Sequence, residues 1–505
     1  MSDTLFAKTS RTEHRLILPQ QEIAYTAIAG WQPLYESEKP IAQMFHVAYL
    51  TQPQASQGSS ERPITFVFNG GPGAAAAYLH MGSLGPKRVA FGQNGSLPKP
   101  PTRVVDNPES WLSFTDLVFI DPIGTGFSRY SPEKKESKPT PEGTPSDKSS
   151  PDSAEPEPAK VFWEVERDIK SLGEFIQRFL SRHQRWLSPV FIAGESYGGF
   201  RVAKLARHLQ QGYGVGLSGA ILISPAIEFS LLYGNDYNLT AWASLIPSFA
   251  ATARHHGRAH PDLSAQPLAD FLGAAEQFAQ KILIPFLALG GRVEDGERQV
   301  VFQQLSRWIG LPPSVIERHD GRITIEVFAR ELLRDQRRIV GLYDGSMTAI
   351  DPFPDRLTYG GADPTLDGID RLFTAAINSH LRQTLQVETD LTYHLLNEEV
   401  FKAWKFNSEG ELKQGYLGSL DDLRIGMSLN PYMQVVVSHG IYDLVTAYFG
   451  SNYLATLMKL APELRPNLTL KHYLGGHMFY SWDDSRQAWF SDMRELYQRV
   501  LCEQI

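Results

Sequence analysis

The chain contains very little cysteine. Among its 505 residues only Cys502 is a cysteine, so no disulfide can form within the chain. Residues 1–20 also lack an uninterrupted apolar segment, because charged side chains recur at Asp3, Lys8 and Arg11. A secretory signal peptide needs such a segment, and disulfides are typical of exported proteins. Both absences predict a cytoplasmic protein.

Long hydrophobic runs and an excess of positive charge are missing too. The most apolar run, residues 282–289, contains a proline and is far shorter than the roughly 20 residues of a membrane-spanning helix. The formal net charge of -8 provides no basic surface for nucleic acid or anionic lipid. We therefore expect neither a membrane protein nor a nucleic-acid partner. The hydrophobic content of 42% is enough for a large core, and nothing here predicts an oligomeric state.

Short β-type runs alternate with helical patterns along much of the chain. Apolar side chains at helical spacing predict helices over 161–180 and 200–210. Runs bounded by turn residues predict strands at 14–19, 23–29, 41–51, 64–68, 117–121, 189–193, 220–224, 434–438 and 468–474. Strands that alternate with helices predict an α/β protein, with a mostly parallel central sheet covered by helices on both faces.

Two segments interrupt this alternation. Residues 131–160 contain seven prolines and almost no apolar side chains, so we expect a disordered loop. Between 229 and 430 the strand signal fades and helical patterns dominate, for example over 323–340. We therefore expect a core built from 1–228 and 431–505, with residues 229–430 inserted as a helical lid.

The most informative motif is Gly-Glu-Ser-Tyr-Gly-Gly at 194–199. It matches the G-x-S-x-G nucleophile elbow of the α/β-hydrolase fold, in which a tight strand-to-helix turn lifts a serine hydroxyl above the sheet. Its place between a predicted strand and a predicted helix is the one that this turn requires. We therefore predict that Ser196 is a nucleophile, and a turn serine without a catalytic role is the alternative.

A serine hydroxyl becomes reactive when a histidine takes its proton and a carboxylate orients that histidine. In α/β-hydrolases the acid and then the histidine follow the serine, each in a loop after a strand. Asp443 and His477 follow the last two predicted strands in this order. They are the predicted acid and base. His472 lies inside a predicted strand, so we assign it a structural or surface role. His439 lies close to Asp443, so it either fills the loop or supports the residues of the site.

A glycine-rich turn, Asn-Gly-Gly-Pro-Gly at 69–73, follows the predicted strand 64–68. Acyl transfer requires N–H donors at the place where an oxyanion develops. This turn can supply one donor, and the N–H of Tyr197, directly after the nucleophile, can supply another. The turn lacks the Lys-Ser/Thr ending of a phosphate-binding loop. An ordinary turn is the remaining alternative.

Five motifs, in the same order, resemble those of the serine carboxypeptidase family and span most of the predicted core. They are Phe-Asn-Gly-Gly-Pro-Gly at 68–73, Asp-Pro-Ile-Gly-Thr-Gly-Phe-Ser at 121–128, Gly-Glu-Ser-Tyr-Gly-Gly at 194–199, Gly-Ile-Tyr-Asp at 440–443 and Gly-Gly-His-Met at 475–478. The lid sequence Val-Gly-Leu-Tyr-Asp-Gly at 340–345 also resembles the bacterial branch of this family.

The resemblance implies a serine-type carboxypeptidase, which releases the last residue of a peptide through an acyl-enzyme. Ser196 would attack the peptide carbonyl, His477 would move the proton, and Asp443 would orient His477. The N–H groups of Gly71 and Tyr197 would hold the oxyanion. The implied partner is a peptide with a free C-terminus, and no metal or cofactor is implied.

The resemblance also implies a site for the terminal carboxylate of the peptide, formed by Asn69, the N–H of Gly70 and Glu195. A glutamate suits this role when it is protonated, and burial beside an anion raises a carboxyl pKa. The family pairs this glutamate with a second one, but the matching position here is Ser83, and the motif cysteine is Ala74. A salt-bridged surface glutamate is the alternative role for Glu195.

Other functions use the same residues. Esterases and acyltransferases share the triad, because fold and triad do not fix the substrate. An aminopeptidase with a similar glycine turn is a further alternative, although Glu195 beside the nucleophile favours carboxylate binding. A non-catalytic binding protein is disfavoured, because Ser196, Asp443 and His477 are all present.

Overall fold

One large sheet forms the centre of the chain. The computed structural model describes residues 8–18, 21–51, 62–131, 158–232, 234–356, 359, 361–406 and 417–502, so most of the predicted loop 131–160 lies outside the described residues. The strands of the sheet are β1 (Ser10–Ile17), β2 (Glu22–Glu36), β3 (Lys39–Thr51), β4 (Ile64–Phe68), β7 (Asp116–Ile120), β8 (Arg129–Tyr130), β9 (Val190–Glu195), β10 (Gly219–Ile223), β13 (Gln434–Gly440) and β14 (Leu468–Tyr473).

The order of the strands confirms the predicted mostly parallel sheet. Neighbours follow the order β1-β2-β3-β7-β4-β9-β10-β13-β14, and β8 pairs with β3. From β7 to β14 all pairs are parallel. The strands β1, β2 and β3 extend one edge in antiparallel fashion. Parallel strands place their carboxyl ends at one edge, so the loops after β4, β9, β13 and β14 meet there.

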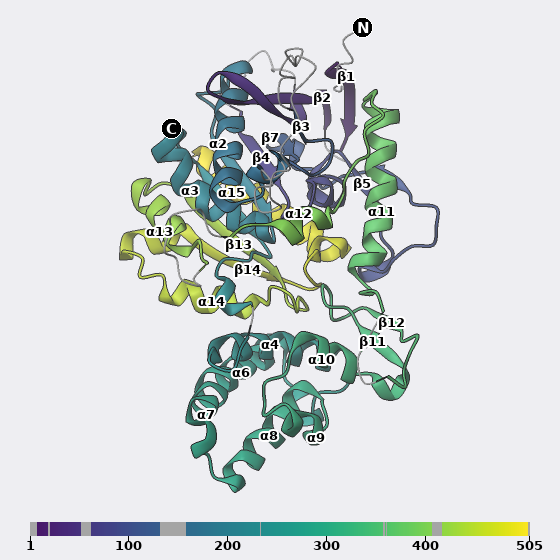
Figure 1. The fold of residues 1–505 in the computed structure, drawn as a ribbon, viewed down its shortest axis with the longest axis vertical. Coiled ribbons are helices and arrows are strands. Elements are labelled where there is room, and N and C mark those ends of the chain that lie inside the picture. The colour runs from purple at the N-terminus through teal and green to yellow at the C-terminus, as the bar shows by residue number, and fades with distance from the viewer. Residues whose placement is uncertain are drawn as a thin grey trace, which may run out of the picture.

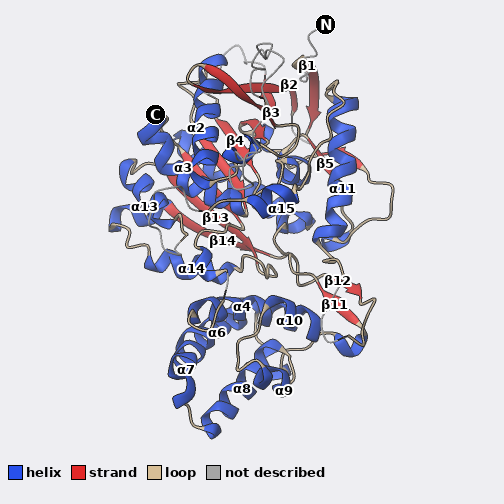
Figure 2. Ribbon diagram, in the orientation of Figure 1, coloured by secondary structure: helices blue, strands red, loops and turns tan. Residues whose placement is uncertain are grey.

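Side chains of the central strands alternate between two hydrophobic clusters, as the period of a strand requires. Phe66 and Phe68 of β4 belong to one cluster, and Val67 belongs to the other. The helices α2 (Val165–Arg182), α3 (Tyr197–Tyr213) and α13 (Leu420–Leu429) contribute to the cluster that contains Phe66. The helices α11 (Leu366–Ser379) and α15 (Asp483–Cys502) contribute to the opposite cluster. Figure 2 shows helices around the sheet, as predicted.

A third hydrophobic cluster is centred on a group of helices set apart from the sheet (Figure 1). These helices are α4 (Leu239–His255), α5 (Pro261–Ser264), α6 (Leu268–Phe278), α7 (Ile284–Leu289), α8 (Asp295–Ile309), α9 (Pro313–Arg318) and α10 (Ile325–Glu331). A hairpin of β11 (Arg338–Val340) and β12 (Thr348–Ile350) follows them along the chain. We call residues 239–350 the lid lobe.

The structure differs from the predicted lid in two respects. The predicted helix 323–340 is broken: α10 ends at Glu331, and Arg337 adopts a left-handed φ of 55° before β11, a conformation that an α-helix cannot contain. In addition, α11 and α13 fall within the predicted insertion 229–430 but pack in the clusters of the sheet. An amphipathic helix shows in its sequence that it has an apolar face, but not which surface covers that face.

Further short strands and α-helices belong to the described structure. They are the paired strands β5 (Lys87–Val89) and β6 (Val104–Asp106), and the helices α1 (Ala77–Leu79), α12 (Glu398–Ala403) and α14 (Tyr448–Leu457). Within the described ranges, none of the helices combines the length and apolar character needed to cross a membrane.

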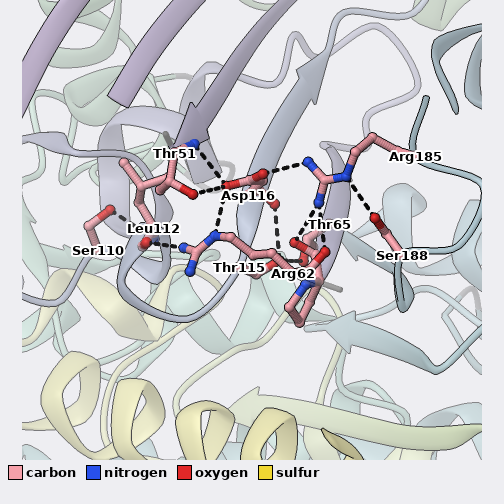
Figure 3. Close-up of polar contacts among 10 residues, drawn as sticks. Thr51, Arg62, Thr65, Ser110, Leu112, Thr115, Asp116, Arg185 and Ser188 are labelled. Carbon is pink, nitrogen blue, oxygen red and sulfur yellow. Dashed lines mark hydrogen bonds and ion pairs between the residues drawn. The ribbon is translucent and has the colours of Figure 1, made fainter. Parts of the chain in front are cut away.

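A buried ion network lies at the amino end of β7, opposite the carboxyl edge of the sheet (Figure 3). Asp116, which is 2% exposed, accepts hydrogen bonds from Arg62 Nε at 2.8 Å and from Arg185 Nη1 at 2.6 Å. Its Oδ1 also accepts from the N–H and the hydroxyl of Thr51. Arg185 in turn donates to the hydroxyl of Ser188 and to the carbonyl of Arg62. The network therefore joins four separate segments around one carboxylate.

We expect Asp116→Ala to lower the free energy of unfolding by about 3–5 kcal/mol, because a buried charge would remain on Arg185 without its partner. The matched control is Asp106→Ala, which removes a carboxylate that is 66% exposed and paired with Lys87. Exposed pairs contribute about 0–1 kcal/mol. Chemical denaturation of the three proteins measures both effects, and equal losses would contradict a special role for the buried network.

Candidate active site

Ser196 lies on a sharp turn between β9 and α3. Its backbone has φ 61° and ψ -124°, a strained conformation for a residue with a side chain. Hydrogen bonds hold it there: its N–H donates to the carbonyl of Ile223 at 2.9 Å, and its carbonyl accepts from the N–H of Ala226 at 3.1 Å. A Cβ on Gly194 would collide with the carbonyl oxygen of Gly198, so this turn needs glycine. This is the geometry that the elbow motif predicts.

Asp443 and His477 are hydrogen-bonded to each other in the loops after β13 and β14. Asp443 Oδ2 lies 2.7 Å from His477 Nδ1, and both residues are buried. The other oxygen of Asp443 accepts from the N–H groups of Val445 and Thr446, and the Thr446 hydroxyl donates to Oδ2 at 2.7 Å. These contacts fix the carboxylate, which in turn fixes the imidazole.

The turn that carries Ser196 and the loop that carries His477 contact the same short segment. Ser224 Oγ donates to the carbonyl of His477 at 2.8 Å, and Ala226 N–H donates to the carbonyl of Ser196. Within the part of the chain that the structure describes, no hydrogen bond joins Ser196 Oγ to His477, and His477 Nε2 has no hydrogen-bond partner. Such bonds are often long before substrate binds. The free Nε2 is the nitrogen that can accept the serine proton.

The ionisation of this pair suits a general base. Burial by itself would raise the pKa of Asp443, but the charge and hydrogen bond of His477 and the bonds from Thr446 bring it below its ordinary value. Burial by itself would lower the pKa of His477, but the charge and hydrogen bond of Asp443 raise it above its ordinary value. Asp443 is therefore ionised at neutral pH and can stabilise an imidazolium at His477.

The glycine turn after β4 lies directly against the elbow. A Cβ on Gly70 would collide with the N–H of Tyr197, so the two segments can approach this closely only with glycine here. Arg201 of α3 donates to the carbonyl of Asn69 at 2.6 Å, and its charge is paired with the buried Asp168 at 2.7 Å. This bond ties the turn to the helix that begins after Ser196.

The two N–H groups that are predicted to hold the oxyanion have no hydrogen-bond acceptor in the described part of the protein. Among the described residues, neither the N–H of Gly71 nor that of Tyr197 donates a hydrogen bond. Tyr197 is the first residue of α3, and the N–H groups at the start of a helix have no partner inside the helix. Both donors therefore remain available for an anion formed next to Ser196.

Glu195 is buried next to this site, with 1% of its surface exposed. Its Oε2 accepts hydrogen bonds from Asn69 Nδ2 and, at 3.1 Å, from the hydroxyl of Tyr480. Its Oε1 is buried and has no partner among the described residues. Burial raises the pKa of Glu195 to about 7, against the opposing effects of His477, Tyr480 and Asn69. The carboxyl is thus protonated in part at neutral pH, and the surface salt bridge considered above is wrong.

The segment 341–346 of the lid lobe is bonded to both loops of the catalytic pair. The carbonyl of Tyr343 accepts from the N–H of His477 at 2.5 Å, and Asp344 Oδ2 accepts from the N–H of Gly476 at 3.0 Å. The same segment exchanges backbone hydrogen bonds with Tyr442 and Leu444, on either side of Asp443. We call it the brace, because it fixes the positions of the loops that carry the acid and the base.

Several of these residues could not be identified from the sequence. Thr446, Arg201 and Tyr480 belong to no motif, and only their contacts reveal a role. Asp344 lies in the lid sequence 340–345, which resembled the family without a stated role.

The two rival histidines have other partners. His439 Nε2 lies 2.8 Å from Ser451 Oγ, and His472 Nε2 lies 2.9 Å from Asn452 Oδ1. These contacts support the structural roles assigned to them. In the described ranges no group of three His, Cys, Asp or Glu side chains is arranged to hold a metal ion.

Comparison with known proteins agrees with this architecture. The serine carboxypeptidase family model matches residues 20–240, which include the glycine turn and the elbow but not Asp443 or His477. The chain is 25% identical over 248 residues to serine carboxypeptidase-like 5 of Arabidopsis thaliana, covering 45% of this chain and 48% of that protein. It is 30% identical over 179 residues to serine carboxypeptidase-like 13 of the same plant, covering 35% of each chain. The chain thus spans about half or less of the length of these relatives.

Similarity to solved structures extends over almost the whole chain. Kex1(delta)p, a prohormone-processing carboxypeptidase from Saccharomyces cerevisiae, superposes with a TM-score of 0.55 over 94% of this chain and 91% of its own, at 17% identity. At this identity the likeness shows the fold, which is that of the α/β-hydrolases. Residues 20–240 therefore resemble the serine carboxypeptidase family, and the chain has an α/β-hydrolase fold.

Proposed function

We propose that this protein is a serine carboxypeptidase that hydrolyses the last peptide bond of a substrate with a free C-terminus. The observation that carries the proposal is the position of the buried Glu195 directly beside Ser196, with an oxygen that has no hydrogen-bond partner among the described residues. A buried polar atom without a hydrogen-bond partner calls for an explanation, and a bound substrate carboxylate would supply one. The Asp443–His477 pair supplies the base, and the match of residues 20–240 to the serine carboxypeptidase family model supports the assignment.

In the proposed mechanism the hydroxyl of Ser196 attacks the carbonyl carbon of the last peptide bond while His477 Nε2 takes its proton. The N–H groups of Gly71 and Tyr197 stabilise the negative oxygen of the tetrahedral intermediate. When the intermediate collapses, the C–N bond breaks and His477 gives its proton to the departing amino group. Water then attacks the acyl-Ser196 ester by the same route in reverse and releases the shortened peptide.

The terminal carboxylate is bound by three groups in this proposal. The N–H of Gly70 and the amide of Asn69 lie in the glycine turn, and protonated Glu195 donates its proton as a hydrogen bond. A neutral acid is needed, because an ionised Glu195 would repel the carboxylate of the substrate. These contacts place the last peptide bond, rather than an internal one, over Ser196.

Amidating the C-terminus of the substrate tests this proposal. We expect kcat/KM for a blocked dipeptide to fall at least 100-fold when its free carboxylate is replaced by an amide, because the charge-assisted bonds to that group are lost. The matched substrate is the same dipeptide with a free acid, assayed across pH. Equal rates with both substrates would contradict a carboxypeptidase and favour the esterase or acyltransferase alternative. Cytoplasmic location and membership of the bacterial branch stay predictions.

A further inference from the structure

The family position of a second glutamate is occupied here by Ser83, and the ring of Tyr480 lies beside it. A Cβ on Gly82 would lie 2.6 Å from the Tyr480 ring, so the glycine leaves the space that the ring fills. Tyr480 is completely buried and its hydroxyl reaches Glu195 Oε2, whereas Ser83 Oγ is buried without a partner among the described residues. The side chain that contacts Glu195 from this direction is therefore a phenol and not a carboxylic acid.

We infer that Tyr480 is a positioning residue that replaces the second acid, and that its hydrogen bond keeps the carboxyl proton of Glu195 on Oε1, where it meets the substrate carboxylate. This inference rests on the function proposed above. It concerns how Glu195 alone, without a second acid beside it, binds the carboxylate of the substrate.

The hydrogen bonds around Glu195 determine where its proton lies. A neutral carboxyl carries its proton on one oxygen only. The amide of Asn69 is oriented by the N–H of Leu79, which donates to its Oδ1 at 3.1 Å, so its Nδ2 must donate to Glu195 Oε2. Tyr480 adds a second donor to the same oxygen. Oε2 is therefore the acceptor oxygen, and the proton belongs on Oε1.

The unpaired Glu195 Oε1 indicates that a ligand binds at this position. A buried O–H without an acceptor is unfavourable, and such groups in folded proteins call for an explanation such as a bound partner. A substrate carboxylate is the acceptor that would satisfy it. A second glutamate in place of Tyr480 would share the proton and couple two titrations. Burial raises the pKa of Tyr480 well above its ordinary value, so this partner does not titrate with Glu195.

The pH dependence follows from the groups that face Glu195. The titratable ones are Tyr78, Asp443, His477 and Tyr480. Because the substrate needs protonated Glu195, kcat/KM falls as pH rises through the pKa of that carboxyl. The bond from Tyr480 stabilises the ionised carboxylate and so lowers this pKa. Loss of the bond therefore moves the alkaline limb to higher pH.

We expect Tyr480→Phe to move the alkaline limb of kcat/KM upward by about one pH unit, the shift that corresponds to losing one hydrogen bond to a charged group. The assay uses the blocked dipeptide with a free C-terminus. Incorporation of 3-fluorotyrosine at position 480 makes the phenol a stronger donor, so it should move the limb downward. The control is Tyr497→Phe, which removes a buried hydroxyl bonded to Thr65 near the amino end of β4 and should leave the limb in place. Glu195→Gln, whose amide donates without titrating, should remove the limb.

Opposite shifts from the two changes at position 480 would support the inference, since a purely structural ring would produce neither. An unshifted limb in folded Tyr480→Phe would overturn it. If that variant does not fold, an unshifted limb in the fluorotyrosine protein would overturn it instead. Failure of the proposed function shows separately, as unchanged cleavage by the wild-type protein when the dipeptide is amidated.

Discussion

Replacing Ser196 with alanine is expected to reduce kcat by a factor on the order of 10⁴ to 10⁶, because the proposed mechanism forms the acyl-enzyme on its hydroxyl. The remaining donors and binding contacts stabilise the transition state for direct attack by water only weakly. The loss should appear in kcat, whereas binding of a peptide with a free C-terminus should persist. Steady-state rates and equilibrium binding of the blocked dipeptide measure the two separately.

The matched control for this variant is Ser428→Ala, which removes an exposed hydroxyl bonded only within α13. It should retain full activity. A fluorophosphonate probe should label the wild-type protein and Ser428→Ala but not Ser196→Ala. Turnover by folded Ser196→Ala at even a tenth of the wild-type rate would rule out Ser196 as the nucleophile.

Asp443→Asn should lower kcat by about 10⁴-fold with little change in folding, because the amide holds His477 in the wrong tautomer. An asparagine donates to Nδ1 and thereby places the proton on Nε2, the nitrogen that must accept from Ser196. The charge of Asp443 also raises the pKa of His477. Activity requires neutral His477, so the acidic limb of the remaining activity should move to lower pH.

The control for Asp443→Asn is Asp492→Asn, at a carboxylate that bonds Lys471 and Tyr473 outside the site. This variant should keep its rate and its acidic limb. An acidic limb of Asp443→Asn that coincides with that of the wild-type protein would mean that Asp443 does not govern His477.

The sheet could be predicted because its strands carry strong local signals. The run 64–68 is apolar throughout and ends in glycines, and it forms β4 at the same residues. The lid lobe was predicted less well, because no glycine or asparagine marks the left-handed turn at Arg337 that precedes β11. The helices α11 and α13 were assigned to the lid because the sequence of an apolar face does not indicate which surface it packs against.

The residues of the site also fall into those that the sequence could identify and those that it could not. The elbow, the glycine turn and the loops with Asp443 and His477 have fixed backbone geometry, which restricts their sequences and makes them recognisable. Arg201, Thr446 and Tyr480 act through side chains that reach across the fold, and distances in space cannot be read from distances along the chain. The resemblance revealed the absence of a second acid at Ser83, but only the structure reveals the hydrogen bond from Tyr480 to Glu195.

The brace connects the inserted lobe directly to the loops that carry Asp443 and His477. The N–H groups of Gly476 and His477 and two backbone groups beside Asp443 find their partners in the brace, which follows more than 100 residues of inserted chain. A shortened homologue that discards everything between β10 and β13 would leave these groups unsatisfied and the imidazole poorly aligned. The returning end of the insertion is therefore the part that holds the loops of Asp443 and His477 in place.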